Sequence, residues 1–341
     1  MPKPRILLLY TGGTIGMVKN FETGALRVFN FKKLLQRIPE LRQLDCDIDT
    51  LSFESPIDSS DMEPTKWVKM AGIIQDNYND FDGFVILHGS DTMSYSASAL
   101  SFMLQGLTKP VVFTGSQLPI GDLRTDAKEN LITAIQIASL NEGGQPVIKE
   151  VCLYFEYKLY RGNRTTKISA EHFNAFTSPN YNALAESGVH LRVNNEQLLQ
   201  PTGVDFSVTT AFNSNVVIVK MFPGITAAVL SAITAIEGLK GIVLETYGSG
   251  NAPTEDWFIG ILQKAIEKGI HIVNVTQCSG GRVNMGQYET STLLKEIGVI
   301  SGADITTEAA ITKMMYLLGQ EMLPERFKPL FETSLCGELT Q

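Results

Sequence analysis

Cysteine and histidine are scarce in this sequence, with four of each among 341 residues. The cysteines are far apart, no CxxC occurs, and no two histidines have the spacing of an HExxH motif. Clusters of these residues are the usual signs of a structural metal site or a disulfide framework. We therefore expect no bound metal, and free thiols in a reducing compartment at Cys46, Cys152, Cys278 and Cys336.

Long hydrophobic runs and dense basic stretches are also missing. No segment approaches the roughly 18 consecutive apolar residues that span a bilayer, and the run ILLLY at 6–10 is too short for the core of a secretion signal. The net charge is −8, which argues against nucleic acid or an anionic membrane as a partner. These absences predict a cytoplasmic protein.

Short apolar runs do occur, and they alternate with amphipathic segments. In the first half of the chain we expect strands at 5–10, 83–88, 110–115 and 150–157, and helices at 64–78, 94–107 and 126–140. Such alternation is typical of an α/β fold with a mostly parallel sheet that helices cover on both faces.

A polar stretch with Pro and Gly interrupts this alternation at 193–213, and we interpret it as a linker. It separates a larger N-terminal domain, 1–192, from a smaller C-terminal α/β domain, 214–341. In the second domain the pattern predicts strands at 216–222, 238–248 and 269–277, with helices at 226–238 and 255–269.

Hydroxyl and carboxylate side chains gather where the predicted strands end. Ligands of parallel α/β sheets bind at the carboxyl ends of strands, so several such loops together predict a site, although any one of them fits ordinary cap and turn chemistry. The loops are TGGTIG with Thr11 and Thr14, SPIDSSDM with Asp58, Ser59, Ser60 and Asp61, GSDTMS with Ser90, Asp91 and Thr92, and SQLP with Ser116 and Gln117.

The turn TGGTIG does not fit a nucleotide-binding loop. A dinucleotide fingerprint requires glycine where Thr11 stands, and the Lys-Ser/Thr pair of a phosphate-binding loop is missing. Gly12 and Gly13 are better explained as residues that let the backbone approach a small ligand closely. The following segment, 17–28, is predicted to be a mobile loop.

A hydroxyl nucleophile needs a base, and with histidine scarce a lysine–carboxylate pair is the natural substitute. A desolvated lysine loses its proton more readily and can then take one from a neighbouring alcohol. Asp91 offers the carboxylate, and Lys167 in YRGNRTTK is the candidate lysine. A solvated surface lysine is the alternative interpretation of Lys167.

Taken together, the motifs resemble the L-asparaginase family, and in particular its bacterial cytoplasmic (type I) branch. They stand in the family's order along the whole chain: TGGTIGM, DSSDM, DGFVILHGSDTM, SALSFML, TGSQLP, LYRGNRTTK, YGSGNAP and TQC. The resemblance implies two α/β domains, no cofactor, and hydrolysis of L-asparagine to L-aspartate and ammonia through a threonine acyl-enzyme. It also implies active sites formed in a homodimer, usually paired into a homotetramer.

The resemblance assigns roles to individual residues. Thr14 corresponds to the nucleophile, and Ser90, Asp91 and Lys167 correspond to a second catalytic cluster. Asp58, Ser59 and Ser60, together with Ser90 and Asp91, correspond to the residues that hold the amino-acid end of the substrate. Asn251 corresponds to a residue that reaches the active site of a neighbouring subunit.

The sequence departs from the family pattern in three places. Ser90 stands where threonine is usual, and the segment 17–28 lacks the tyrosine that hydrogen-bonds the nucleophile in relatives. Some type I enzymes bind asparagine at a regulatory site; Thr166 and Cys278 match it, but Glu245 replaces its arginine. Because a carboxylate repels the carboxylate of an effector, we expect weak or absent regulation. Glutamine hydrolysis and a non-catalytic amino-acid sensor are the alternative functions.

Overall fold

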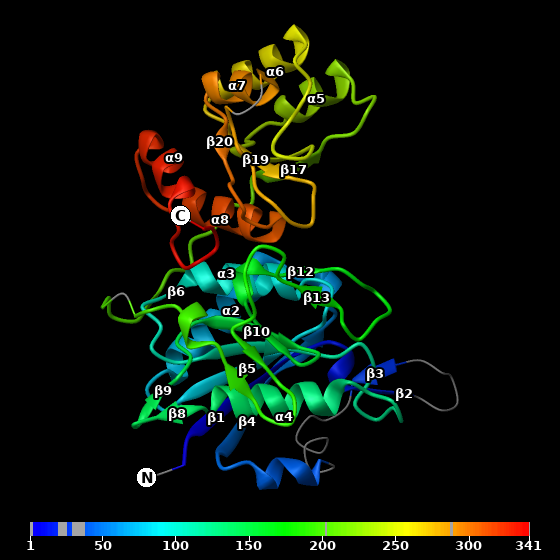
Figure 1. The fold of residues 1–341 in the computed structure, drawn as a ribbon, viewed down its shortest axis with the longest axis vertical. Helices are drawn as coiled ribbons and strands as arrows, with labels where there is room; N and C mark the ends of the chain where they lie inside the picture. The colour runs from blue at the N-terminus through cyan, green and yellow to red at the C-terminus, as the bar shows by residue number, and fades with distance from the viewer. Residues whose placement is uncertain (1–2, 20–25, 29–37, 202, 287–288, 341) are drawn as a thin grey trace. The chain divides into compact units, whose positions relative to one another are not determined.

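The computed structural model describes residues 3–19, 26–28, 38–201, 203–286 and 289–340. The chain forms two compact units, a larger one at Met1–Thr210 and a smaller one at Ala211–Gln341 (Figure 1). Among the described residues, no helix is both long and apolar enough to cross a membrane.

The larger unit contains an eight-stranded sheet with the strand order β15-β14-β11-β10-β7-β5-β1-β4. The five strands from β4 to β10 pair in parallel, and the pairs β10–β11, β11–β14 and β14–β15 are antiparallel. This confirms the prediction of a mostly parallel sheet. The strands are β1 (Arg5–Gly12), β4 (Asp47–Ile57), β5 (Gly83–Leu87), β7 (Val111–Thr114), β10 (Val151–Phe155), β11 (Lys158–Arg161), β14 (Ala185–Glu186) and β15 (Arg192–Val193).

Helices cover both faces of the parallel half of this sheet. The helices α2 (Pro64–Asn77) and α3 (Met93–Met103) lie on one face, and α4 (Ala127–Ala138) lies on the other (Figure 1). Every residue of β5 and β7, and every residue of β1 after Arg5, is buried. Burial on both faces explains why these strands are continuous apolar runs rather than alternating ones.

Short elements complete the larger unit. They are η1 (Thr14–Gly16), β2 (Met17–Lys19), β3 (Leu26–Val28), η2 (Pro39–Gln43), η3 (Ser59–Asp61), β6 (Leu104–Gln105), β8 (Asn141–Glu142), β9 (Gln145–Pro146), η4 (Gly162–Arg164), β12 (Thr166–Lys167), β13 (Phe176–Thr177), η5 (Asn195–Gln197) and β16 (Ser207–Val208). The strands β2 and β3 pair at the two ends of the segment 17–28, and the middle of the expected loop lies outside the described residues.

The strand order reverses at β1. The chain passes from β1 to β4 on one side and then crosses to β5 on the other. A reversal of this kind opens a crevice between loops at the carboxyl ends of the strands, where α/β proteins bind their ligands. The loops after β1, β4 and β5 therefore meet at the switch point of the sheet.

The smaller unit has a parallel sheet in the order β17-β18-β19-β20. The helices α5, α6 and α7 lie on one side of it, and α8 and α9 lie on the other (Figure 1). The elements are β17 (Val216–Lys220), α5 (Ala227–Thr234), β18 (Gly241–Thr246), α6 (Asp256–Glu267), β19 (His271–Thr276), α7 (Glu289–Glu296), β20 (Ile300–Ser301), α8 (Thr307–Gly319) and α9 (Pro324–Glu332). A smaller C-terminal α/β unit, as predicted, is thus present.

Two parts of the larger unit differ from the expectations. The strand expected at 150–157 ends at Phe155, because Glu156 and Tyr157 adopt positive φ angles of 46° and 71° and turn the chain into β11. Non-glycine residues rarely adopt such angles, so the sequence carried no turn signal. Within 193–213, the predicted linker, β16 pairs with β6, and the ring of Phe206 stacks on Tyr78.

Candidate active site

The turn after β1 is pressed against two neighbouring loops. A Cβ atom added to Gly12 would lie 1.9 Å from the carbonyl oxygen of Ile57, and one added to Gly13 would lie 2.5 Å from the nitrogen of Gly89. Both glycines also have positive φ angles, 143° and 84°, which favour glycine. The glycines of TGGTIG thus bring this turn directly against the ends of β4 and β5.

This contact places Thr14 at the switch point. Thr14 begins η1 and is half-buried, and its hydroxyl makes no hydrogen bond to any described residue. Tyr10, in β1, packs against η1: a Cβ atom added to Gly16 would lie 2.3 Å from the Tyr10 hydroxyl oxygen. The burial of Tyr10 raises its pKa to about 12, so this phenol stays protonated at neutral pH.

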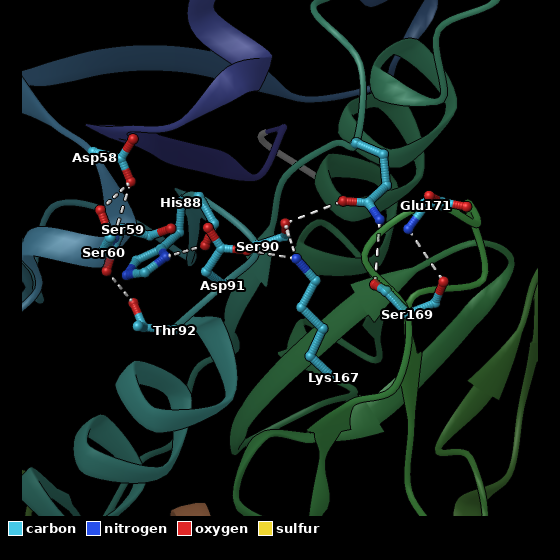
Figure 2. Close-up of polar contacts among 12 residues, drawn as sticks. Asp58, Ser59, Ser60, His88, Ser90, Asp91, Thr92, Lys167, Ser169 and Glu171 are labelled. Atoms are coloured by element: carbon cyan, nitrogen blue, oxygen red, sulfur yellow. Dashed lines mark hydrogen bonds and ion pairs between the residues drawn. The ribbon is translucent and has the colours of Figure 1, made fainter.

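Lys167 faces the loop after β5. Its Nζ donates to Ser90 Oγ at 2.8 Å and to Asp91 Oδ1 at 2.6 Å, as Figure 2 shows. The Lys167 side chain is 17% exposed and that of Asp91 is 63% exposed. The structure therefore brings together the hydroxyl, lysine and carboxylate that the sequence singled out, and the solvated-surface alternative for Lys167 does not fit this burial.

Gln117 extends this cluster. It is among the loop residues named from the sequence, where it was assigned no role. Its Oε1 accepts from Ser90 Oγ at 3.1 Å, and its Nε2 donates to the carbonyl of His172 at 3.1 Å. Asp126 accepts from the backbone N–H of Gln117 at 2.9 Å. Gln117 thus links the loops after β5, β7 and β12.

Ser59 and its neighbours form the third loop of the site. Asp58 caps η3, because its Oδ1 accepts from the backbone N–H of Ser60 at 2.9 Å and from its hydroxyl at 2.8 Å. These two bonds hold the pKa of Asp58 below its usual value. Ser59 is buried, and Thr92 donates to its carbonyl at 2.7 Å. A Cβ on Gly89 would lie 2.5 Å from Ser59 Oγ, so this loop also contacts the loop after β5 (Figure 2).

His88 supports the loop after β5 from within the core, and sequence reasoning gave it no role. Its Nδ1 lies 2.6 Å from the carbonyl oxygen of Gly89, and its Nε2 lies 2.9 Å from Ser96 Oγ. A carbonyl can only accept, so Nδ1 carries the proton and Nε2 accepts from Ser96, which in turn accepts from Trp67 Nε1. Burial lowers the pKa of His88 to about 4, so the ring is neutral and fixes the orientation of Gly89.

The other predicted site residues lie in different places. Asn251 follows β18 in the smaller unit, where its backbone N–H donates to the carbonyl of Tyr247 at 2.8 Å. Glu245 and the exposed Cys278 are also in the smaller unit, and Thr166 is in β12 of the larger one. Glu245 Oε1 accepts from Thr307 at 2.6 Å, and Lys220 Nζ lies 3.5 Å from its Oε2.

No group of His, Cys, Asp and Glu suited to hold a metal ion occurs in the part of the chain that the structure describes. A threonine turn lies against the loop of a serine–lysine–carboxylate cluster at the switch point of the sheet, an arrangement that fits a hydrolase. Two family models match the chain: "Asparaginase, N-terminal" at residues 5–199 and "Glutaminase/Asparaginase C-terminal domain" at residues 215–331. The protein therefore belongs to the asparaginase family.

Known relatives match this chain over nearly its whole length. L-asparaginase 1 of Escherichia coli is 44% identical over 342 residues, covering 100% of this chain and 99% of that protein. A 60 kDa lysophospholipase of Mus musculus is 40% identical and is covered over 63% of its length. The crystal structure of L-asparaginase I from Vibrio cholerae superposes with a TM-score of 0.91 at 39% identity, covering 99% of this chain and 100% of that one.

Proposed function

We propose that this protein hydrolyses the side-chain amide of L-asparagine to L-aspartate and ammonia, with Thr14 as the nucleophile. The observation that carries the proposal is the contact between the backbones of Gly13 and Gly89. It brings the turn that carries Thr14 against the loop that carries Ser90 and Asp91, which both contact Lys167. L-asparaginases are also the relatives that match this chain over the full length of both proteins.

The reaction proceeds in two steps. Thr14 Oγ attacks the amide carbon of the substrate, its proton passes to the amide nitrogen, and ammonia leaves as the Thr14 ester forms. Water then attacks the ester carbon, which restores the Thr14 hydroxyl and releases the second carboxylate with one proton. Ser90 and Lys167 form a hydrogen-bonded pair that carries protons in both steps.

The backbone of the loop after β5 supplies oxyanion donors. None of the N–H groups of Gly89, Ser90 and Asp91 donates to a described residue, so they are available for the negative oxygen of the tetrahedral intermediate. One such donor is worth about 10²–10³-fold in kcat. The hydrogen bond from His88 to the Gly89 carbonyl holds this peptide in place.

The amino-acid end of the substrate binds between the loops after β4 and β5. Asp91 gives only its Oδ1 to Lys167, which leaves Oδ2 for the substrate ammonium group. Ser59, Ser60 and Asp58 contribute hydroxyls and a carboxylate from the other side. Asn251 completes the site from a neighbouring subunit of a homodimer or homotetramer in the cytoplasm, and the reaction uses no cofactor or metal.

Regulation by asparagine at Thr166, Glu245 and Cys278 is absent or weak in this proposal. The Glu245 carboxylate already accepts a hydrogen bond from Thr307, and its negative charge opposes an effector carboxylate. We expect hyperbolic kinetics with asparagine, both in the wild type and in Glu245→Ala. A sigmoidal response that persists in Glu245→Ala and disappears in Cys278→Ala would contradict this.

Ammonia release from asparagine and from glutamine by the purified protein tests the main proposal. We expect a preference for asparagine and a loss of about 10⁴-fold in kcat for Thr14→Ala. Thr14→Ser is the matched control: it keeps the hydroxyl and should retain most of the activity of the wild type. Faster release from glutamine makes the protein a glutaminase instead. Binding of asparagine without turnover by the wild type supports the amino-acid sensor.

A further inference from the structure

A second hollow lies in the larger unit, beside the antiparallel strands β11, β14 and β15. It has a volume of about 620 Å³, within the usual range for small-molecule sites. No predicted site residue and no member of the Ser90 cluster lines it. The lining side chains include Lys158, Tyr160, Ser178, Glu186 and Arg192.

Three charged residues stand in a row across these strands. Lys158 pairs with Glu186 between β11 and β14, and Glu186 pairs with Arg192 between β14 and β15. Adjacent strands are about 4.8 Å apart, so the long side chains of all three reach one small ligand. None of the three side chains makes a hydrogen bond or an ion pair with a described residue, although cross-strand pairs of opposite charge commonly do.

Tyr160 and Ser178 supply hydroxyls to this hollow. The Tyr160 residue is 7% exposed, and its hydroxyl has no hydrogen-bond partner among the residues that the structure describes. Burial and the charge of Glu186 raise the pKa of Tyr160 to about 12, so the hydroxyl stays protonated and can donate a hydrogen bond. The hydroxyl of Ser178 is buried and has no partner among the described residues, whereas buried polar groups normally find one.

Another lining residue, Tyr181, is held in place by two contacts. Tyr181 donates to the carbonyl of Gln197 at 3.0 Å, and the guanidinium carbon of Arg161 lies 4.3 Å from the centre of its ring. Arg161 is itself fixed by Glu150 at 2.6 Å within the core. The hollow is therefore formed before any ligand arrives, which lowers the entropy lost on binding.

We propose that this hollow is a binding site for an amino acid with two carboxylates, such as L-aspartate. Lys158 and Arg192 each bind one carboxylate, Glu186 binds the ammonium group between them, and Tyr160 donates to a carboxylate oxygen. The sequence of charges in the row, positive, negative and positive, is the complement of such a ligand. The proposal does not depend on asparagine hydrolysis, because it concerns binding alone.

Equilibrium dialysis with radiolabelled L-aspartate tests the site in Asp91→Ala, in which the active site has lost a ligand for the ammonium group. We expect one bound L-aspartate per chain, and none after Lys158→Ala and Arg192→Ala are added. The matched control replaces two exposed cations of the smaller unit, Lys268 and Arg326, by alanine and keeps the bound aspartate. An unchanged stoichiometry in the Lys158→Ala, Arg192→Ala protein overturns the proposal.

Ligand analogues and single variants test each contact. Succinate lacks the ammonium group and asparagine lacks the second carboxylate, so each should bind at least about tenfold more weakly than L-aspartate. Glu186→Gln should reduce the preference for aspartate over succinate, and Tyr160→Phe should weaken aspartate binding about tenfold. Equal binding of aspartate and inorganic phosphate, or no effect of Glu186→Gln and Tyr160→Phe, contradicts the assignment. Ammonia release by Lys158→Ala should equal that of the wild type, whatever the outcome at the second site.

Discussion

The parallel and antiparallel halves of the large sheet differ in how many of their polar groups have hydrogen-bond partners. In the parallel half, β5, β7 and β10 are buried on both faces, and polar groups near the strand ends form networks such as Trp67–Ser96–His88–Gly89. In the antiparallel half, β14 and β15 have two residues each, and Lys158 and Tyr160 keep donors without partners among the described residues. A reaction requires fixed groups, and the unpaired N–H groups of the catalytic loop belong to a backbone that His88 holds in place. Lys158 and Tyr160 instead lie beside a hollow in which a ligand can bind. The parallel half thus has the features of a catalytic site, and the antiparallel half those of a binding site.

The largest expected difference between the halves is catalytic. Lys167→Met should lower kcat for asparagine by about 10²–10⁴-fold, because Ser90 and Asp91 lose their common partner. Lys158→Met removes the same charge in the antiparallel half and should leave kcat unchanged. Steady-state ammonia release measures both variants. A similar loss in the two would show that general charge, rather than the contact with Ser90, determines the rate.

A second comparison concerns two glycines with nearly the same φ angle. Gly13 has a φ of 84° and contacts Gly89, whereas Gly144 has a φ of 85° with open space around its Cβ position. Gly144→Ala should cost only the strain of the angle, about 1–2 kcal/mol of unfolding free energy. Gly13→Ala should cost more and lower kcat about 10²-fold, because its Cβ would displace the Gly89 backbone.

Urea unfolding monitored by circular dichroism, together with ammonia release, measures both glycine variants. Equal costs in stability and unchanged turnover for Gly13→Ala would mean that the turn of Thr14 has room to relax. In that case the close contact between the loops after β1 and β5 is not required for activity.

The parallel half was predictable from the sequence, and the antiparallel half was not. The strands at 5–10 and 83–88 are apolar because both faces are covered, and apolar runs are the clearest local signal. Strands of two residues, such as β14, are too short for any periodicity. The contact of Lys167 with Ser90 joins residues 77 positions apart. No spacing rule predicts it: the need for a base made Lys167 a candidate but left a solvated surface lysine open, and the resemblance then assigned it to the catalytic cluster.

The buried network of the parallel half should make stability depend on pH. Burial lowers the pKa of His88 from the ordinary histidine value of 6.5 to about 4 in the folded protein. Between these values the unfolded chain binds more protons than the folded one, so the unfolding free energy falls as the pH falls from about 6.5 to about 4. For this one group the loss is about 3 kcal/mol.

Urea unfolding at several pH values checks this dependence against His88→Gln, which cannot titrate. The difference in unfolding free energy between wild type and His88→Gln should shrink by about 3 kcal/mol over that pH range. A difference that does not change with pH would show that the pKa of His88 is not lowered in the folded protein, and burial would then not be what keeps its ring neutral.

The smallest expected effect compares two buried tyrosines. Tyr154 in the parallel half donates to Glu129 Oε1 at 2.5 Å, whereas Tyr160 in the antiparallel half has no described acceptor. Tyr154→Phe removes one of the two donors to Glu129, the other being Thr133, and should cost about 1–2 kcal/mol of unfolding free energy. Tyr160→Phe removes a hydroxyl that makes no hydrogen bond to a described residue in the free protein, so the unfolding free energy should change by less than about 0.5 kcal/mol.

In saturating L-aspartate the loss of unfolding free energy caused by Tyr160→Phe should become larger, because the ligand stabilises the wild type more than it stabilises Tyr160→Phe. If Tyr160→Phe is as destabilising as Tyr154→Phe without ligand, the Tyr160 hydroxyl has a partner of its own, and the contrast between the two halves of the sheet disappears.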